Sequence, residues 1–365
     1  MKKFMKVIGY ILFIPIVLLA TNDYILVNEY YDSNKVEKSN FEKFSNIVSK
    51  NGKQIEFKQK KPVKIYMVYP GEQVSDYWRR SKSSFEARLK ELGIKYELKD
   101  HFSKPSIEMN KQAKALFEAL NSDVDYLIFT LDVKKHLKFI NTILNRKKPK
   151  LILQNITTPL KSLKNNQPFL YDGFDHAIGA RILAKEYIKQ IGKKGSYAVL
   201  YGTTGYVSYM RGDTFIDYLN KNSQLKMVDS YYTDFNKQKA KLATLDIIKN
   251  HKDIKFIYAC STDIALGAIE AIKEKNLIGK IQINGWGGGS CELQAIQDNL
   301  MDFTVMRMND DNGVAMAEAI KFDILNKANE VPLVYSGDFK LVKKGIDLKE
   351  LNKMKKRAFR YSGEN

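Results

Sequence analysis

Short apolar runs alternate with longer amphipathic stretches along most of the chain, and this alternation limits the possible folds more than any other feature. The first apolar run, residues 64–69 (KIYMVY), has the β-branched and aromatic side chains typical of a buried strand. The next stretch carries Phe85, Leu89 and Leu92 at helical spacing, and Gly93 follows as a helix-ending residue. Strands that alternate with helices predict an α/β protein with mostly parallel sheets flanked by helices.

The alternating pattern occurs twice, so the 365 residues predict two α/β lobes. Residues 21–62 are irregular and polar, with some helix at 40–48, and a basic tail follows the last strand. In the first lobe we expect strands 64–69, 95–98, 125–130 and 150–154, and helices 77–92, 107–120 and 133–144. In the second we expect strands 169–171, 197–201, 226–232, 255–259, 281–284, 303–306 and 339–342, and helices 176–191, 207–220, 236–249, 263–275, 292–299 and 312–325.

The first twenty residues have the pattern of an export signal. Lys2, Lys3 and Lys6 are followed by an apolar stretch, residues 7–20, that is shorter than the roughly 20 residues a membrane-spanning helix needs. We therefore expect residues 1–20 to be a signal peptide that sends the protein to the periplasm, with an uncleaved anchor as the alternative.

The formal net charge of +19 raises the question of a nucleic-acid partner. The charge is uneven, because residues 51–150 carry a net +10 whereas residues 251–350 carry −3. Neither a helix-turn-helix nor a zinc-finger pattern accompanies the lysines, so we expect a solvated basic surface and no nucleic-acid partner. The two cysteines, Cys260 and Cys291, lack metal-site spacing and fit either two buried thiols or one bridge.

Ligands of open α/β sheets bind at the carboxyl ends of the strands, and both tryptophans of the chain fall there. Trp78 follows the first predicted strand of the first lobe, and Trp286 follows a strand of the second. Their flat faces suit the rings of sugar-like molecules, and packing in the core is the alternative.

Arg211 and Arg307 also lie at predicted strand ends, in separate elements. Two planar guanidinium groups suit an anionic, oxygen-rich ligand, because each can donate two parallel hydrogen bonds. Structural ion pairs with Asp213 and Asp310, which are near in sequence, are the alternative.

Neutral hydrogen-bonding side chains occupy further strand ends, namely Gln73, Ser75, Asn155 and Thr262. For Thr262 the alternative is helix capping. The sequence lacks the nucleophile elbow and the H-E-x-x-H motif of hydrolases, so we expect a binding protein that needs no cofactor rather than an enzyme.

Several of these segments together resemble the LuxP family, the periplasmic receptors for the quorum-sensing signal autoinducer-2 in vibrios. The resemblance runs from about residue 62 to 362. It is carried by PGEQVSDYW at 70–78, DYLIFTLD at 125–132, LILQNITTP at 151–159, YMRGDTF at 209–215, FIYACSTD at 256–263, INGWGGGS at 283–290 and TVMRMNDD at 304–311.

The resemblance implies a two-lobed type I periplasmic-binding-protein fold, whose ligand is a furanosyl borate diester and whose partner is the periplasmic domain of a LuxQ-type sensor kinase. It implies ligand contacts from Gln73, Ser75, Trp78, Asn155, Arg211, Thr262, Trp286 and Arg307. The division that we expect is a signal peptide at 1–20, an extension at 21–62, a first lobe of 63–156 with 308–332, and a second lobe of 157–307 with 333–365.

Three other functions use a similar fold and remain open at this point. The first is a periplasmic sugar-binding protein of an ABC importer, because fold alone does not determine function. The others are an enzyme that acts on the furanone and a DNA-binding repressor. The apolar residues 7–20 and the lack of a helix-turn-helix motif speak against the repressor.

Overall fold

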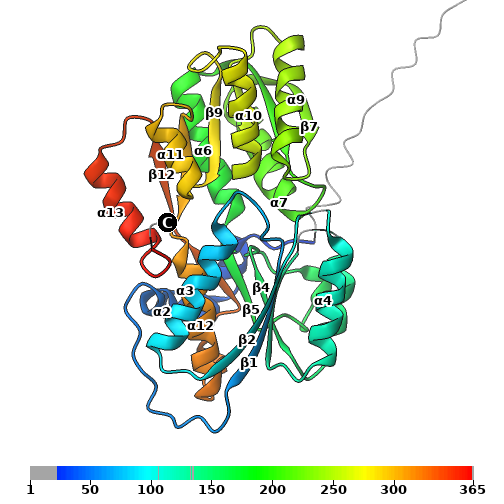
Figure 1. The fold of residues 1–365 in the computed structure, drawn as a ribbon, viewed down its shortest axis with the longest axis vertical. Coiled ribbons are helices and arrows are strands. Elements are labelled where there is room, and N and C mark those ends of the chain that lie inside the picture. Colours follow the sequence, from blue (N-terminus) through cyan, green and yellow to red (C-terminus); the bar gives the residue numbers. More distant parts are fainter. Residues whose placement is uncertain (1–22, 106, 132, 134, 364–365) are drawn as a thin grey trace, which may run out of the picture.

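The computed structural model describes residues 23–105, 107–131, 133 and 135–363, and contains two sheets of six strands each. The strand order is β11-β5-β4-β3-β1-β2 in one sheet and β12-β10-β9-β8-β6-β7 in the other. Helices cover both sheets, and the two resulting lobes stack along the long axis of the molecule (Figure 1). This confirms the predicted α/β class with two mostly parallel sheets.

The first lobe is built around β1 (Val63–Tyr69), whose side chains are buried on both faces of the sheet. Ile65 and Met67 pack toward α3 and α12, whereas Tyr66 and Val68 pack toward α4 and α5. This two-sided burial explains why the sequence of the strand is a nearly continuous apolar run. The other elements are β2 (Tyr96–Phe102), β3 (Tyr126–Thr130), β4 (Lys150–Gln154), β5 (Leu170–Phe174), β11 (Val334–Gly337), α3 (Tyr77–Glu91), α4 (Met109–Asn121), α5 (His136–Leu144) and α12 (Asp310–Ile324).

The second lobe has a core of stacked aromatic rings. Phe256 on β8 stacks on Tyr187 of α6 at 4.0 Å and on Tyr197 of β6 at 5.0 Å between ring centroids. The elements of this lobe are β6 (Lys194–Tyr201), β7 (Gln224–Tyr232), β8 (Phe256–Ala259), β9 (Gln282–Gly287), β10 (Phe303–Arg307), β12 (Phe339–Lys343), α6 (His176–Ile191), α7 (Tyr206–Ser208), the π-helical turn η3 (Tyr209–Asp213), α8 (Thr214–Asn222), α9 (Lys237–Asn250), α10 (Thr262–Glu274) and α11 (Ser290–Gln297).

The chain crosses between the lobes at places that differ from the expected boundaries. Strand β5 pairs with β4 of the first lobe, and β11 pairs with β5, so residues through Phe174 and then Val334–Gly337 belong to the first sheet. The boundaries drawn at 156/157 and 332/333 placed both strands in the second lobe, and they are corrected here. The β5–β11 pairing joins segments that are about 160 residues apart, which a local hydrophobic pattern does not register.

The segments before and after the two lobes contain more regular structure than expected. The extension at 21–62 contains α1 (Val27–Ser33) and α2 (Lys35–Val48), and the basic tail contains α13 (Leu348–Ala358). Leu351 and Phe359 join the core of the second lobe. Figure 1 shows α13 on the flank of the molecule, beside the junction of the lobes.

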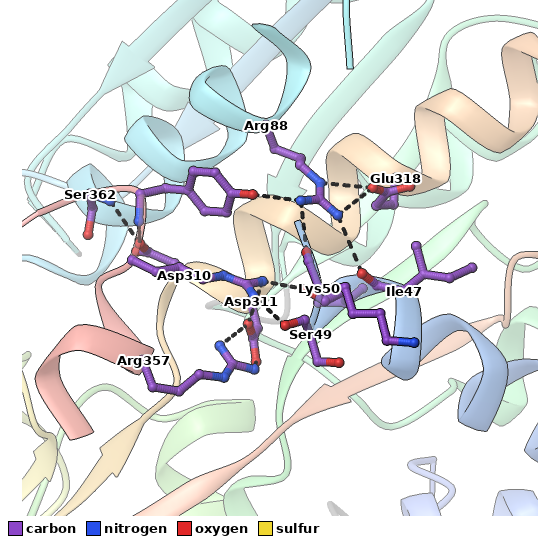
Figure 2. Close-up of polar contacts among 12 residues, drawn as sticks. Ile47, Ser49, Lys50, Arg88, Asp310, Asp311, Glu318, Arg357 and Ser362 are labelled. Carbon is purple, nitrogen blue, oxygen red and sulfur yellow. Dashed lines mark hydrogen bonds and ion pairs between the residues drawn. The ribbon is translucent and has the colours of Figure 1, made fainter. Parts of the chain in front are cut away.

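A polar cluster holds the tail and the extension on the first lobe (Figure 2). The fully buried Arg88 of α3 pairs with Glu318 of α12 at 2.7 Å. Its guanidinium also donates to the Lys50 carbonyl at 2.9 Å and to the Tyr361 hydroxyl at 2.6 Å. Asp311 of α12 binds Arg357 and Arg360 of the tail. The tail therefore contacts both lobes.

Within the described residues, no helix is both long and apolar enough to span a bilayer. The predicted signal peptide at 1–20 lies outside the described residues. Among those residues there is also no cluster of three or more histidine, cysteine or acidic side chains arranged to hold a metal ion.

Candidate functional site

A cavity lies between the lobes, at the carboxyl ends of the strands of both sheets. Its volume is about 50 Å³, so it suits a small molecule. All eight residues predicted as ligand contacts line it. The lining residues are Pro70, Gln73, Ser75, Tyr77, Trp78, Ser103, Lys104, Pro105, Met109, Gln112, Val133, Asn155, Thr203, Val207, Arg211, Phe235, Ser261, Thr262, Trp286 and Arg307.

The two tryptophans line the cavity and are also packed into their lobes. Trp78 is 4% exposed and lies 4.7 Å from the Tyr69 ring between centroids. Trp286 is 1% exposed, and its indole N–H donates to the Tyr258 hydroxyl at 3.0 Å. The core interpretation is therefore confirmed, while ligand contact by the two rings stays a prediction. For Trp286 the polar edge is already used, so only its ring is left to face the cavity.

Arg211 lies in the π-helical turn η3, a type of irregularity that often occurs at functional sites. Its Nη1 donates to the Cys260 carbonyl at 2.7 Å, and its guanidinium stacks 3.9 Å from the centroid of the Trp286 ring. Burial, with a smaller contribution from Arg307, lowers the pKa of Arg211 to about 9. The side chain remains a cation at neutral pH but is poorly compensated.

Arg307 ends β10 and is compensated even less. It is 4% exposed, and its Nε is buried without a hydrogen-bond partner. Its guanidinium lies 4.4 Å from the Tyr77 ring and 5.3 Å from the Trp286 ring. Burial lowers the pKa of Arg307. Cation–π contacts offset only part of the cost of burying a charge.

The alternative of structural ion pairs does not hold for these arginines. Asp213 accepts a hydrogen bond from the Tyr201 hydroxyl at 2.7 Å, and Asp310 accepts from the backbone N–H groups of Tyr361 and Ser362. Among the described residues, none of the cavity-lining side chains is acidic. Two buried cations with no acidic side chain among the described residues that line the cavity fit a ligand rich in oxygen or negative charge.

Neutral polar groups complete the lining. Asn155 Oδ1 and Ser261 Oγ are buried and have no protein partner, so each is free for a ligand hydrogen bond. Asn155 itself has a positive φ of 64°. Thr262 opens α10 without capping it, because its hydroxyl donates to the Trp286 carbonyl at 3.5 Å. The alternative of helix capping by Thr262 is therefore wrong, and Ser261 holds the N-cap position. Gln73 and Ser75 lie in the loop between β1 and α3.

Sequence reasoning missed several residues of the site. Tyr77 lines the cavity from the first turn of α3, and its hydroxyl accepts from Asn312 Nδ2 at 2.7 Å. Lys104 also lines it and was missed because β2 runs to Phe102, four residues beyond the predicted end at 98. Phe235 lines it too, three residues after the correctly predicted end of β7 at Tyr232, and was not singled out. The two cysteines are free, Cys260 buried and Cys291 exposed, so Cys291 differs from the expected buried thiol.

The lobes also touch each other at the mouth of the cavity through Asp263. Its carboxylate, on α10 of the second lobe, accepts from the backbone N–H of Val74 at 2.9 Å and of Ser75 at 3.1 Å in the first lobe. Ser290 of α11 makes a parallel contact, with its N–H and hydroxyl 3.2 and 3.1 Å from Asp76 Oδ2. These bonds form between protein groups alone and favour the closed arrangement.

Replacing Asp263 with Asn should shift the ligand-free protein toward an open arrangement. The Asn side chain places an N–H group against one of the two backbone N–H groups, so one hydrogen bond between the lobes is lost. A hydrogen bond to a charged group contributes about 1.5–3 kcal/mol to stability. We expect a larger radius of gyration in small-angle X-ray scattering and an affinity at least about tenfold weaker. Asp32→Asn, at an exposed pair with Lys35, is the control. An unchanged radius and affinity would count against this contact as a clasp.

A family comparison agrees with this geometry. The family described as "Periplasmic binding protein domain" matches residues 65–327, which include both sheets' central strands and most of the cavity lining. The chain belongs to this family. Periplasmic binding proteins are two-lobed, and the matched segment stops close to the end of α12, before β11 and the tail.

Named relatives of this periplasmic binding protein are sugar-binding proteins. The "D-allose-binding periplasmic protein" of Escherichia coli K12 is 24% identical over 273 residues, covering 73% of this chain and 86% of its own. A solute-binding protein from Actinobacillus succinogenes 130z with bound D-allose has a TM-score of 0.68 at 21% identity, covering 78% and 98%. A structure named "XylFII-LytSN complex" has a TM-score of 0.67 at 22% identity, covering the same shares. At these identities the structures show the fold alone.

Proposed function

We propose that this periplasmic binding protein is an exported receptor that closes its lobes around a small, oxygen-rich, monosaccharide-like ligand. The observation that carries the proposal is the cavity itself, where two tryptophan faces and unpartnered polar atoms surround two buried guanidinium groups. Flat apolar faces with converging hydrogen-bond groups suit a ring that carries hydroxyl groups. The sugar-binding relatives support this class of ligand.

The family and the apolar residues 7–20 support an exported location. The named relatives are binding proteins, and some are named as import proteins. Delivery of the ligand to an ABC importer is therefore the first function to test.

A second candidate is a receptor for autoinducer-2 in its furanosyl borate form. The lack of any acidic residue among the described lining residues favours it, because a neutral sugar leaves the charges of Arg211 and Arg307 uncompensated. A tetrahedral borate diester is an anion that also carries hydroxyl groups, and it would neutralise one of the two cations. The output would then pass to a LuxQ-type sensor kinase. The solved neighbour named "XylFII-LytSN complex" shows that a protein of this fold can assemble with another protein.

Isothermal titration calorimetry separates these candidates. The purified chain is titrated with D-ribose, D-allose and D-galactose in borate-free buffer, and with the autoinducer-2 precursor with and without boric acid. A sugar receptor binds one of the sugars regardless of borate, whereas an autoinducer-2 receptor binds only the borated furanone. Mass spectrometry of ligand released from freshly purified protein, with boron detection, gives an independent answer. If neither class binds and no ligand is released, both candidates fail.

A further inference from the structure

His176 is buried directly behind the cavity, where the chain enters the second lobe. It is the first residue of α6, immediately after the crossover from β5, and is 1% exposed. Its Nε2 lies 3.0 Å from the Asn155 carbonyl of the first lobe, and its Nδ1 lies 3.2 Å from Arg211 Nε of the second. One imidazole therefore joins two cavity-lining residues that belong to different lobes.

The partners of the ring determine its tautomer. A carbonyl oxygen can only accept, so Nε2 must carry the hydrogen that points to Asn155. The Nε–H of an arginine can only donate, so Nδ1 must be unprotonated to accept from Arg211. The ring is neutral with its proton on Nε2. Burial, together with the positive charges of Arg211 and Arg307, lowers the pKa of His176 well below its ordinary value and keeps this form at neutral pH.

Neighbouring groups leave the imidazole little freedom to turn. The ring of Tyr206 lies 5.5 Å away and that of Trp286 lies 5.4 Å away between centroids, both edge-on. The adjacent carboxylate of Asp175 caps α6 by accepting from the N–H groups of Ala177 and Ile178, so it does not compete for the ring. The Arg211 guanidinium is thus held at three points: the His176 Nδ1, the Cys260 carbonyl and the Trp286 face.

We propose that His176 is a positioning residue of the binding site. Its unprotonated Nδ1 fixes the direction of the Arg211 guanidinium, and its Nε2–H fixes the peptide of Asn155, so one side chain sets a ligand contact on each lobe. Two fixed contacts on opposite lobes spare the ligand the entropic cost of ordering a long arginine side chain. The inference rests on the proposed ligand contacts of Arg211 and Asn155.

Three substitutions separate the two hydrogen bonds from simple packing. His176→Asn keeps an acceptor near the Nδ1 position, His176→Gln keeps a donor near the Nε2 position, and His176→Phe keeps only a ring. Affinity is measured by calorimetry with D-allose and with borated autoinducer-2. We expect His176→Phe and His176→Gln to weaken binding about tenfold or more, and His176→Asn to stay within about fivefold of the parent.

A ligand-free measurement tests the same geometry. With selective ¹⁵N labelling of arginine and histidine, an N–H···N hydrogen bond gives a scalar coupling between Arg211 Nε and His176 Nδ1. We expect this coupling in the parent and in the control variant His251→Phe. His251 lies on the second lobe, where its ring contacts Asp229. We expect its loss in all three His176 variants, because none offers a nitrogen acceptor there.

The coupling tests the hydrogen-bond geometry of His176, and the affinities test the proposed ligand. If the parent shows no coupling, or its His176 Nδ1 is protonated, the proposal is overturned whatever the ligand is. If the coupling is present but no probe binds, the function proposed above fails while the geometry stands. Equal affinities for the Asn and Gln variants would reduce His176 to a packing residue. Thermal unfolding and near-ultraviolet circular dichroism check each variant's fold, and the Asn–Gln comparison decides should His176→Phe not fold.

Discussion

Arg307→Met should abolish ligand binding and at the same time make the protein more stable. The side chain is buried without a hydrogen bond or an ion pair among the described residues, so its charge costs free energy in the ligand-free state. Removing it should raise the free energy of unfolding by about 1–4 kcal/mol, the range seen when buried ionic groups are replaced by apolar side chains of similar volume. The ligand loses a charge-assisted, two-pronged contact, so we expect an affinity loss of about 100-fold or more.

Calorimetric titration of the Arg307→Met protein checks the predicted loss of affinity. Chemical denaturation of the same sample checks the predicted gain in the free energy of unfolding. The control is Arg146→Met, since Arg146 is an exposed side chain that donates to the Leu120 carbonyl far from the cavity. It should change neither quantity appreciably. A destabilised Arg307→Met protein would show that the native guanidinium has a partner in solution, and an unchanged affinity would remove Arg307 from the site.

Arg88→Met should destabilise the protein more than any surface substitution, although it lies away from the cavity. The change removes the 2.7 Å partner of Glu318, which is also fully buried, and leaves it only the partly exposed Lys321. It also leaves the carbonyl of Lys50 and the hydroxyl of Tyr361 without their donor. Breaking a buried pair by removing one partner costs about 3–5 kcal/mol. We expect thermal unfolding to shift down by roughly 6–20 °C.

The double variant Arg88→Met with Glu318→Met is the informative companion. With both charges removed, the desolvation cost of this pair disappears, and we expect about half of the lost stability to return. The return is incomplete because Glu91 and Lys321 each lose an ion-pair partner. Lys99→Met, at an exposed pair with Glu118, should cost no more than about 1 kcal/mol. If the single and double variants are equally unstable, packing rather than the charge pair accounts for the loss. Ligand affinity at a temperature where both remain folded should stay near that of the parent.

The sequence predicted the site better than the lobe boundaries, and the reason is physical. Trp78 and Asn155 could be placed together in one lobe, and Trp286 and Arg307 in the other, because parallel strands all end at the same edge of their sheet. Strand β11 was missed because its four residues, VYSG, are too short for a periodic signal, and it forms only by pairing with β5. Which lobe a strand joins depends on such distant pairing.

Helix α13 and His176 show two other kinds of limit. Residues 348–358 are so rich in lysine that their sequence predicts a solvated tail. They form a helix instead, in which only Leu351 and Ala358 are buried. His176 was recognised only as a helix start, because its contacts with Asn155 and Arg211 cross both lobes. That no acidic side chain of the described residues lines the cavity likewise became visible only once the chain was folded, since Asp213 and Asp310 are close in sequence but bonded elsewhere.

The unequal accessibility of the two thiols gives this protein a built-in attachment point for an optical reporter. Cys260 is buried, and burial raises the pKa of its thiol, so it is a poor nucleophile toward a maleimide dye. Cys291 is exposed and directly follows Ser290, whose contacts with Asp76 exist only when the lobes meet. A polarity-sensitive fluorophore on Cys291 would therefore brighten or dim as the lobes separate, which turns the unmodified sequence into a sensor for its own ligand.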